Sequence, residues 1–117
     1  MKTVELITKD ELFKKVNMKH SQLCCYLNKE NDIHINGSLT LEGKWSEDCV
    51  ATIKANLCDK DGNILYIVRD FSSINFKKIE YVTFSIYCAN IARFFDAEKL
   101  HHVELYPYMD SVKNDHM

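Results

Sequence analysis

The chain is poor in the residues that interrupt regular structure. Its 117 residues include three glycines (Gly37, Gly43 and Gly62) and a single proline, Pro107. Glycine adopts a positive φ at little cost, and proline fixes φ and lacks an amide donor, so both residues mark bends. Their scarcity excludes a low-complexity chain and predicts one folded domain in which each of the four lies at a bend or a strand end.

Long apolar runs and an excess of one charge are also missing. No segment approaches the roughly 20 apolar residues of a membrane-spanning helix, and the N-terminus lacks the apolar stretch of a signal peptide. Unless the chain derives from a longer secreted precursor, we expect a cytoplasmic protein without a membrane partner. The formal net charge is −2, from 17 acidic and 15 basic residues that are mixed along the chain. Because nucleic-acid binders draw their affinity from clustered Lys and Arg, we expect no nucleic-acid partner.

The cysteines form no CxxC pair, and their number is odd. Such a set is typical of a reducing compartment, where free thiols act as small hydrophobic side chains of the core. We interpret most of the five in this way. They are Cys24, Cys25, Cys49, Cys58 and Cys88.

The stretch 49–71 organises the rest of the chain. Residues 49–57 alternate between small or apolar and polar side chains, which is the period of a strand with one buried face. Asp59, Asp61 and Gly62 then supply the side-chain hydrogen bonds and the positive φ of a tight turn. A second apolar run follows at 64–68, so we predict a β-hairpin.

Other strands and one helix follow from similar patterns. Thr8 and Glu11 have the spacing of a capping box, which predicts a short helix at about 9–17. Residues 32–43 fit either one bent strand or a hairpin that turns at Asn36-Gly37, and the unbroken alternation favours the single strand. Pro107 suits an edge strand or a strand end. Residues 90–100 fit either a helical turn or a loop. Further strands are predicted at 4–7, 23–27, 79–88 and 101–108.

These elements predict an all-β fold, an antiparallel β-sandwich with six or seven strands and one short N-terminal helix. The connections include a loop at 44–48, in which we expect Trp45 to fold back on a sheet edge, and a crossing loop at 72–78. The single domain is expected to span 1–110, with a flexible tail at 111–117.

One strand ends in a D-x-D-G turn, a second opens with a small aliphatic pair, and an aromatic-rich F-x-I strand follows later. The residues of this pattern are Ala51, Ile53, Ala55, Leu57, Cys58, Asp59, Asp61, Gly62, Ile64, Leu65, Phe84 and Ile86. Together with the last strand, these three strands resemble small bacterial immunoglobulin-like domains of the FxLYD type. Residues 56–59 read Asn-Leu-Cys-Asp where that family has its Phe-x-Leu-Tyr-Asp run, so both aromatic positions differ. The resemblance covers about half of the chain. It implies that the β-sandwich is of immunoglobulin-like type and has an adhesion or interaction role in an exported protein.

The sequence carries no spacing typical of a metal site. The Asp59–Gly62 turn does not match a calcium loop, because its glycine falls at position four where position six is required. His101 and His102 are adjacent and point apart on a strand, so at most one of them could join His34 or a cysteine in a zinc site. We therefore expect no metal site and no cofactor. The five histidines are His20, His34, His101, His102 and His116.

No motif for a nucleotide or an acyl substrate is present, and we expect a protein that is not an enzyme. The alternative is a small thiol- or metal-dependent enzyme, in which Cys24 or Cys25 would act with His34 across neighbouring strands.

Four tyrosines are the residues most suggestive of function. Alternation places Tyr81, Tyr87, Tyr106 and Tyr108 on the outer faces of strands. Strand propensity alone would explain them, but tyrosine is also favoured at interfaces because it covers area with few torsions and keeps a polar tip. We predict a binding or assembly module that contacts a protein partner or a second copy through a strand face. Since tyrosine rings also stack on sugars, a carbohydrate-binding module is a further alternative.

Overall fold

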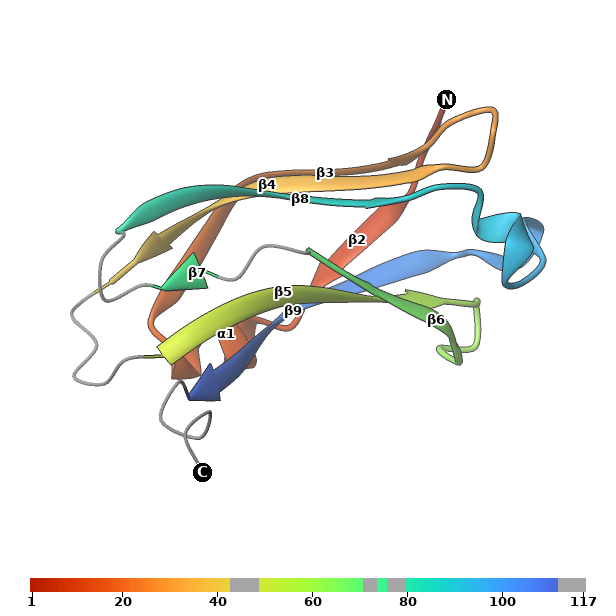
Figure 1. Cartoon of the computed structure of the whole chain (residues 1–117). Coiled ribbons are helices and arrows are strands. Elements are labelled where there is room, and N and C mark those ends of the chain that lie inside the picture. The colour runs from red at the N-terminus through yellow and green to blue at the C-terminus, as the bar shows by residue number, and fades with distance from the viewer. Residues whose placement is uncertain (43–48, 71–73, 76–79, 112–117) are drawn as a thin grey trace.

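The structure, a computed structural model, describes residues 1–42, 49–70, 74–75 and 80–111, with the backbone alone at 49–50, 74–75 and 110–111. In this part of the chain, nine strands form two sheets that lie one above the other (Figure 1). This arrangement confirms the all-β sandwich. The strands outnumber the six or seven expected because the N-terminal segment divides into two and a two-residue strand lies in the predicted crossing loop.

The first sheet has four strands in the order β1-β3-β4-β8, and all neighbours in it are antiparallel. Its strands are β1 (Lys2–Thr3), β3 (Met18–Leu27), β4 (Ile33–Leu41) and β8 (Tyr81–Cys88).

The second sheet has five strands, with the order β2-β9-β5-β6 and β7 paired to the start of β5. Its strands are β2 (Glu5–Thr8), β5 (Cys49–Cys58), β6 (Ile64–Arg69), β7 (Ile74–Asn75) and β9 (His102–Ser111). β2 runs parallel to β9, so the expectation of a wholly antiparallel sandwich was wrong at this pair. The N-terminal segment passes from the first sheet to the second at Val4, which is buried and donates its amide to the Cys25 carbonyl.

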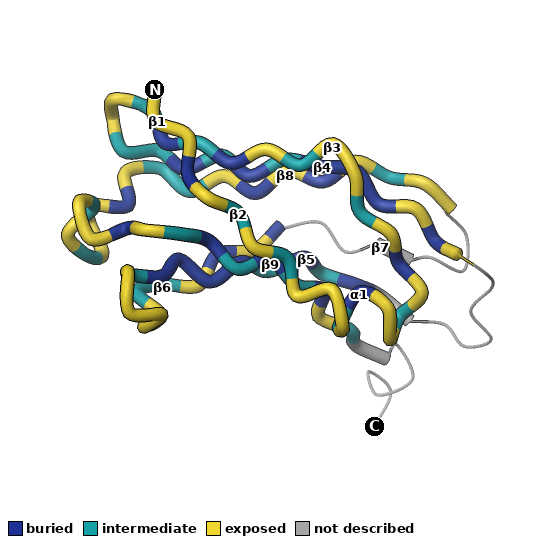
Figure 2. The backbone as a smooth tube through the Cα atoms, turned by 180° about the vertical axis from the view of Figure 1, so that it is seen from behind, coloured by how far each residue is buried: buried dark blue, intermediate teal, exposed yellow. Residues whose placement is uncertain are grey.

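The core lies between the sheets and is built from the inward rows of the strands. More buried and more exposed residues alternate along β8 and β9 and along the first part of β5, as expected for a period of two (Figure 2). The fully buried members of these rows and of β4 are Ile33, Ile35, Leu39, Ala51, Ile53, Ala55, Leu57, Ile86, Val103 and Leu105. The predicted inward and outward rows of β8 are confirmed.

Gly37 lies within β4, which is one continuous strand as favoured from the sequence. A Cβ atom at Gly37 would lie 2.5 Å from Leu23 Cδ2 and 2.8 Å from the Phe84 ring, so only glycine fits without a shift. The glycine is therefore required by the close approach of side chains from the two neighbouring strands. A bulge lies next to it on strand β3, where Gln22 has a φ of 54°.

The predicted hairpin is formed by β5 and β6. In the turn between them Gly62 has a φ of 84°, and the Asp59 carboxylate accepts from the backbone amides of Asp61 and Asn63 at 3.0 and 2.8 Å. These bonds confirm the interpretation of the turn as ordinary turn chemistry.

The predicted helix is present as α1 (Asp10–Lys15), but the capping box is wrong. Thr8 lies one residue before the N-cap position, and its hydroxyl donates to the Asp10 carboxylate at 2.7 Å. Lys9 occupies the N-cap position without a side-chain hydrogen bond. The helix contacts β3 and β9 at one end of the sandwich and buries Phe13 there (Figure 1).

The ambiguous segment 90–100 forms two short 3-10 helices, η1 (Ile91–Arg93) and η2 (Ala97–Lys99), at the other end of the sandwich (Figure 1). Its two buried side chains, Ile91 and Leu100, join the core.

Pro107 lies inside β9, opposite Ile53 of β5. The Ile53 carbonyl accepts from the Asp70 amide at 3.0 Å, so the backbone groups of Ile53 face β6 and the Pro107 nitrogen faces away from β5. On that other side β2 ends opposite Leu105, and Pro107 therefore costs the sheet no ladder bond. The position is a local edge, as predicted.

Trp45, most of the crossing loop and the tail at 112–117 lie outside the described residues. No helix in the described ranges is long and apolar enough to cross a membrane.

Candidate functional site

The four tyrosines lie on opposite outer faces of the sandwich. Tyr81 and Tyr87 belong to β8 in the first sheet, and Tyr106 and Tyr108 belong to β9 in the second. Tyr81, Tyr87 and Tyr108 are about half exposed, whereas Tyr106 is more covered. The structure thus divides the tyrosines between two opposite faces and does not bring them together in one surface.

On the outer face of the first sheet, three aromatic rings form a row across three neighbouring strands. Tyr26 of β3 lies opposite His34 of β4, which lies opposite Tyr87 of β8. The Tyr26 and His34 rings are stacked, with centroids 4.7 Å apart and an interplanar angle of 10°. The His34 and Tyr87 centroids are 4.9 Å apart. Since stacked rings cover each other's faces, this row presents mainly ring edges to solvent.

Small polar side chains continue the same face along the sheet. Ser85 donates to Asn36 Oδ1 at 2.8 Å, and Asn36 Nδ2 donates to the Cys24 sulfur at 3.7 Å. Further along, the Tyr81 hydroxyl donates to Ser38 at 3.1 Å. The face is therefore uncharged along its centre and internally hydrogen-bonded.

β8 forms one edge of the first sheet, and among the described residues it pairs with β4 alone. The Leu41 amide donates to the Glu80 carbonyl at 2.9 Å, which fixes the alternation of hydrogen bonds along the pair. By this alternation Phe84 turns its backbone groups to β4, while Thr83 and Ser85 turn theirs to the open edge. The outward-facing residues of β8 thus also present the unpaired backbone donors and acceptors.

On the outer face of the second sheet, lysine side chains lie over the tyrosine rings. Lys54 Nζ lies 4.0 Å from the centroid of the Tyr108 ring, and Lys9 Nζ lies 5.6 Å from that of Tyr106. Two polar side chains of β5, Asn56 and Cys58, are buried on this face, outside the hydrophobic core cluster.

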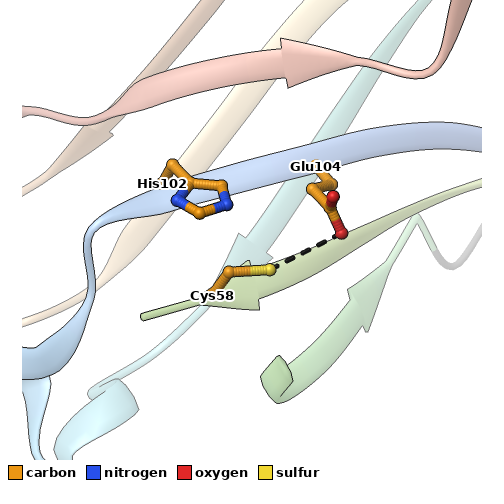
Figure 3. A group of neighbouring side chains, drawn as sticks. All are labelled: Cys58, His102 and Glu104. Carbon is orange, nitrogen blue, oxygen red and sulfur yellow. Dashed lines mark hydrogen bonds between the residues drawn. The ribbon is translucent and has the colours of Figure 1, made fainter. Parts of the chain in front are cut away.

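A cysteine, a histidine and a glutamate meet on this outer face, on β5 and β9 (Figure 3). Cys58 lies directly opposite His102 in the register, and Glu104 follows two residues later on the same face. The Cys58 thiol donates to Glu104 Oε1 at 3.6 Å. One ligand atom from each of the three side chains lies within 4.8 Å of the other two.

Neighbouring side chains hold this cluster in place. Asn56 Nδ2 donates to Glu104 Oε1 at 3.2 Å, and the Tyr106 hydroxyl donates to Asn56 Oδ1 at 3.1 Å. The two ring nitrogens His101 Nδ1 and His102 Nδ1 are 3.0 Å apart and share a hydrogen bond. The expectation that these two side chains point apart was wrong, because β9 begins at His102 and His101 lies outside the strand. The bond from Asn56 lowers the pKa of Glu104, and burial raises the pKa of Cys58 to about 11. Without a bound cation, the pair is a thiol that donates to a carboxylate.

The structure does not pair the cysteines and the histidine that the sequence offered as a nucleophile and its base. Cys24 lies opposite Asn36, and His34 lies opposite Tyr26, so neither faces the other across the strands. Cys25 points into the core, where burial raises its pKa to about 12.

Among the four histidines that the structure describes, His102 alone lies in a cluster of possible metal ligands. Sequence reasoning allowed one of the two adjacent histidines to join a cysteine, but it named neither Cys58 nor Glu104 for such a site. The available signal was the spacing His102-x-Glu104, which puts both side chains on one face of a strand. His20 contacts Asp10 instead, with Nε2 2.9 Å from Oδ1.

Comparison with known proteins finds no relative, since no family model, no curated protein and no solved structure matches the chain. The resemblance to FxLYD-type domains stays a prediction.

Proposed function

We propose that this protein is a non-enzymatic assembly module that forms a homodimer by antiparallel pairing of the β8 strands of two copies. The observation that carries the proposal is that β8, an edge strand, contains no charged residue. Natural proteins usually guard sheet edges with charged side chains, proline or bulges, because an open edge invites pairing with another chain. The edge strands β1, β2 and β6 follow this rule and carry Lys2, Glu5 and Arg69.

The sequence of β8 also suits pairing with itself. Residues 81–87 read YVTFSIY, which is nearly the same from either end. A twofold axis at Phe84 places Tyr81 opposite Tyr87 of the second copy, and Thr83 opposite Ser85. Like side chains then face like side chains, which is the self-complementarity that an isologous interface requires.

The hydrogen-bonding direction agrees with this register. Thr83 and Ser85 turn their amides and carbonyls to the open edge, whereas Phe84 turns its own toward β4. In the proposed pairing the outward groups of one copy meet those of the other, and Phe84 faces its counterpart at a position without backbone bonds. Every backbone group that the edge leaves open along this register gains a partner.

The aromatic row gains a further member in the dimer. It begins at Tyr26 and His34 and ends at Tyr87, which would lie directly opposite Tyr81 of the second copy. Aromatic cross-strand pairs contribute about 0.2–1 kcal/mol each, so the row favours this register over a shifted one.

The arrangement gives less support to a carbohydrate-binding module. A sugar ring stacks on an open aromatic face, but Tyr26 and His34 cover each other and Lys54 lies over Tyr108. Location is supported by a separate observation. The four cysteines whose side chains are described are all free, which favours a reducing compartment such as the cytoplasm.

Thr83→Pro tests the proposal. Because the Thr83 amide faces the open edge, proline there removes no bond to β4, but it removes a donor and places its ring against an approaching strand. In sedimentation velocity over a range of concentrations, we expect the wild type to sediment as a dimer. The variant should sediment as a monomer with an unchanged circular dichroism spectrum.

Thr83→Lys tests the same point without a backbone constraint, since a charge on an edge strand opposes pairing. The matched control is Thr40→Lys, which adds the same charge to the same face on β4, one strand away from the edge. We expect the Thr40 variant to dimerise like the wild type. A wild type that stays monomeric at every concentration, or a Thr83→Lys variant that dimerises as the wild type does, would refute the proposal.

A further inference from the structure

We propose that Cys58, His102 and Glu104 bind a zinc ion on the outer face of the second sheet, away from the β8 edge. The three residues offer a sulfur, a ring nitrogen and a carboxylate oxygen, and these atoms lie within 4.8 Å of one another. They come from two adjacent strands in one register, so the backbone already fixes their relative positions. In the described part of the chain, no other group of three such side chains lies this close together.

The distances suit a tetrahedral ion. Zinc lies about 2.3 Å from sulfur and about 2.0 Å from oxygen, which puts these two ligand atoms roughly 3.5 Å apart. Cys58 Sγ and Glu104 Oε1 are 3.6 Å apart. The contact with His101 occupies Nδ1 of His102 and leaves Nε2 for the ion. Figure 3 shows one ring nitrogen of His102 facing the space beside the other two side chains.

The ligand types select the ion. Thiolate and imidazole favour zinc, whereas calcium and magnesium take oxygen ligands almost exclusively. A Cys58 thiolate and a Glu104 carboxylate together carry two negative charges, which neutralise a divalent cation. On binding, the Cys58 thiol releases its proton to solvent, and the sulfur–hydrogen bond is replaced by a sulfur–zinc bond.

The side chains around the cluster resemble the supports that orient metal ligands. Asn56 donates to the Glu104 carboxylate and is itself held by the Tyr106 hydroxyl. His101 holds the other ring nitrogen of His102. Supports of this kind fix the orientation of the ligands, and they also explain why a buried asparagine lies on the outer face of a sheet. Three protein ligands leave the fourth position of a tetrahedral zinc to water.

The test uses Co²⁺ as a spectroscopic probe of the reduced full-length protein. Cobalt takes the same ligands as zinc, and a thiolate ligand produces a charge-transfer band in the near ultraviolet. We expect this band to saturate at one equivalent of Co²⁺ and to disappear when Zn²⁺ is added. Competition between the two ions then gives the affinity for zinc.

Three variants remove one ligand each: Cys58→Ser, His102→Gln and Glu104→Gln. Loss of a supporting residue alone weakens metal binding about tenfold or more, so loss of a ligand should weaken it by at least that factor. Cys58→Ser should also abolish the charge-transfer band. The controls Cys24→Ser and His34→Gln alter the same residue types on the opposite face and should leave both the band and the affinity unchanged.

Circular dichroism of each metal-free variant checks the fold. Because Cys58 is buried, its replacement could unfold the chain. In that case His102→Gln and Glu104→Gln, at less buried positions, show whether these side chains bind the metal. Absence of a charge-transfer band in the wild type, or ligand variants that bind Co²⁺ like the wild type, would overturn the proposal. Neither result depends on the oligomeric state.

Discussion

Two asparagines occupy matching places on the two outer faces, and only one of them is buried. Asn36 lies on β4 and Asn56 on β5, each in an inner strand of its sheet. Each accepts a hydrogen bond from a hydroxyl group on the next strand. Ser85 donates to Asn36, and Tyr106 donates to Asn56. Yet Asn56 is 4% exposed, while Asn36 is only half-buried.

The difference comes from the length of the cross-strand neighbours. Asn36 lies beside the short side chains Cys24 and Ser85, which leave it open to water. Asn56 lies beside Glu104 and Tyr106, whose longer side chains reach across it. A polar side chain on the outer face of a strand can therefore be buried where longer polar neighbours both cover it and form hydrogen bonds with it.

The largest difference between the two outer faces is expected in the reactivity of their thiols. Cys24 is exposed on the outer face of the first sheet, whereas the next residue, Cys25, points into the core with its pKa raised from 9.0 to about 12. That shift lowers the thiolate fraction of Cys25 at neutral pH roughly a thousandfold, and burial slows access further. We expect iodoacetamide to modify Cys24 first, and Cys25 and the buried Cys58 only on the time scale of unfolding.

Peptide mass spectrometry during the labelling assigns each rate to a residue. In urea all of these cysteines should react at similar rates, which serves as the control. Native labelling of Cys58 as fast as that of Cys24 would mean that the second face is as open as the first.

Truncation of each asparagine compares the two faces directly. Asn56→Ala removes buried hydrogen bonds to a carboxylate and to a tyrosine hydroxyl, and we expect the free energy of unfolding to fall by about 2–3 kcal/mol. Asn36→Ala removes bonds that water can replace and should lower it by less than about 1 kcal/mol. Urea unfolding followed by circular dichroism measures both. Equal losses for the two variants would contradict the comparison.

Removal of the hydroxyl donor gives a smaller difference of the same kind. Tyr106→Phe leaves Asn56 Oδ1 without its partner in a covered site, and we expect a loss of about 1 kcal/mol. Ser85→Ala removes the equivalent donor to Asn36, where water can take its place, and should cost only a few tenths of a kcal/mol. Tyr108→Phe controls for the substitution itself, because Lys54 contacts the ring of Tyr108.

Acid should slightly lower the stability that Asp32 contributes to the turn between β3 and β4, at the border of the first sheet's outer face. Hydrogen bonds from the Asn28 side chain and the Asn90 amide, together with the Tyr87 hydroxyl, hold the pKa of Asp32 below its ordinary value of 3.8. A carboxyl whose pKa is lower in the folded state contributes stability above the unfolded value, and this contribution is lost as the pH falls below it. The stability of the wild type should therefore decline more steeply below pH 3.8 than that of Asp32→Asn.

Urea unfolding at pH values on either side of 3.8 measures the two slopes. Glu30→Gln, which changes an exposed acid in the same turn, should keep the steeper wild-type slope. Identical slopes for wild type and Asp32→Asn would show that the carboxylate contributes nothing to acid sensitivity.

The inward-facing and outward-facing residues of most strands could be predicted from the sequence, because alternation is a local property. The inward residues Ile53, Leu57, Phe84 and Ile86 all follow from a period of two, and the Asp59–Gly62 turn follows from its own side chains. Residues 32–43 fitted either one strand or a hairpin, and the unbroken alternation correctly favoured the single strand β4.

The failures concern pairings between distant segments or competition within one turn. No residue near Cys58 in the sequence indicates that Cys58 lies opposite His102. The cluster of Cys58, His102 and Glu104 could not be predicted, because it depends on the register between β5 and β9. The parallel pairing of β2 with β9 was missed for the same reason. The capping box was wrong because the helix has Lys9 rather than Thr8 as its N-cap, while the Thr8 hydroxyl donates to the Asp10 carboxylate.

The crossing of the N-terminal segment at Val4 has a consequence for how the chain folds during synthesis. β2 is synthesised before its partner β9, because residues 9–101 lie between the two strands. The second sheet therefore cannot close before this whole intervening segment has emerged from the ribosome, and closure of so long a loop is slow. Until then β2 exposes an unpaired strand, so the nascent chain is vulnerable to wrong pairing at this strand.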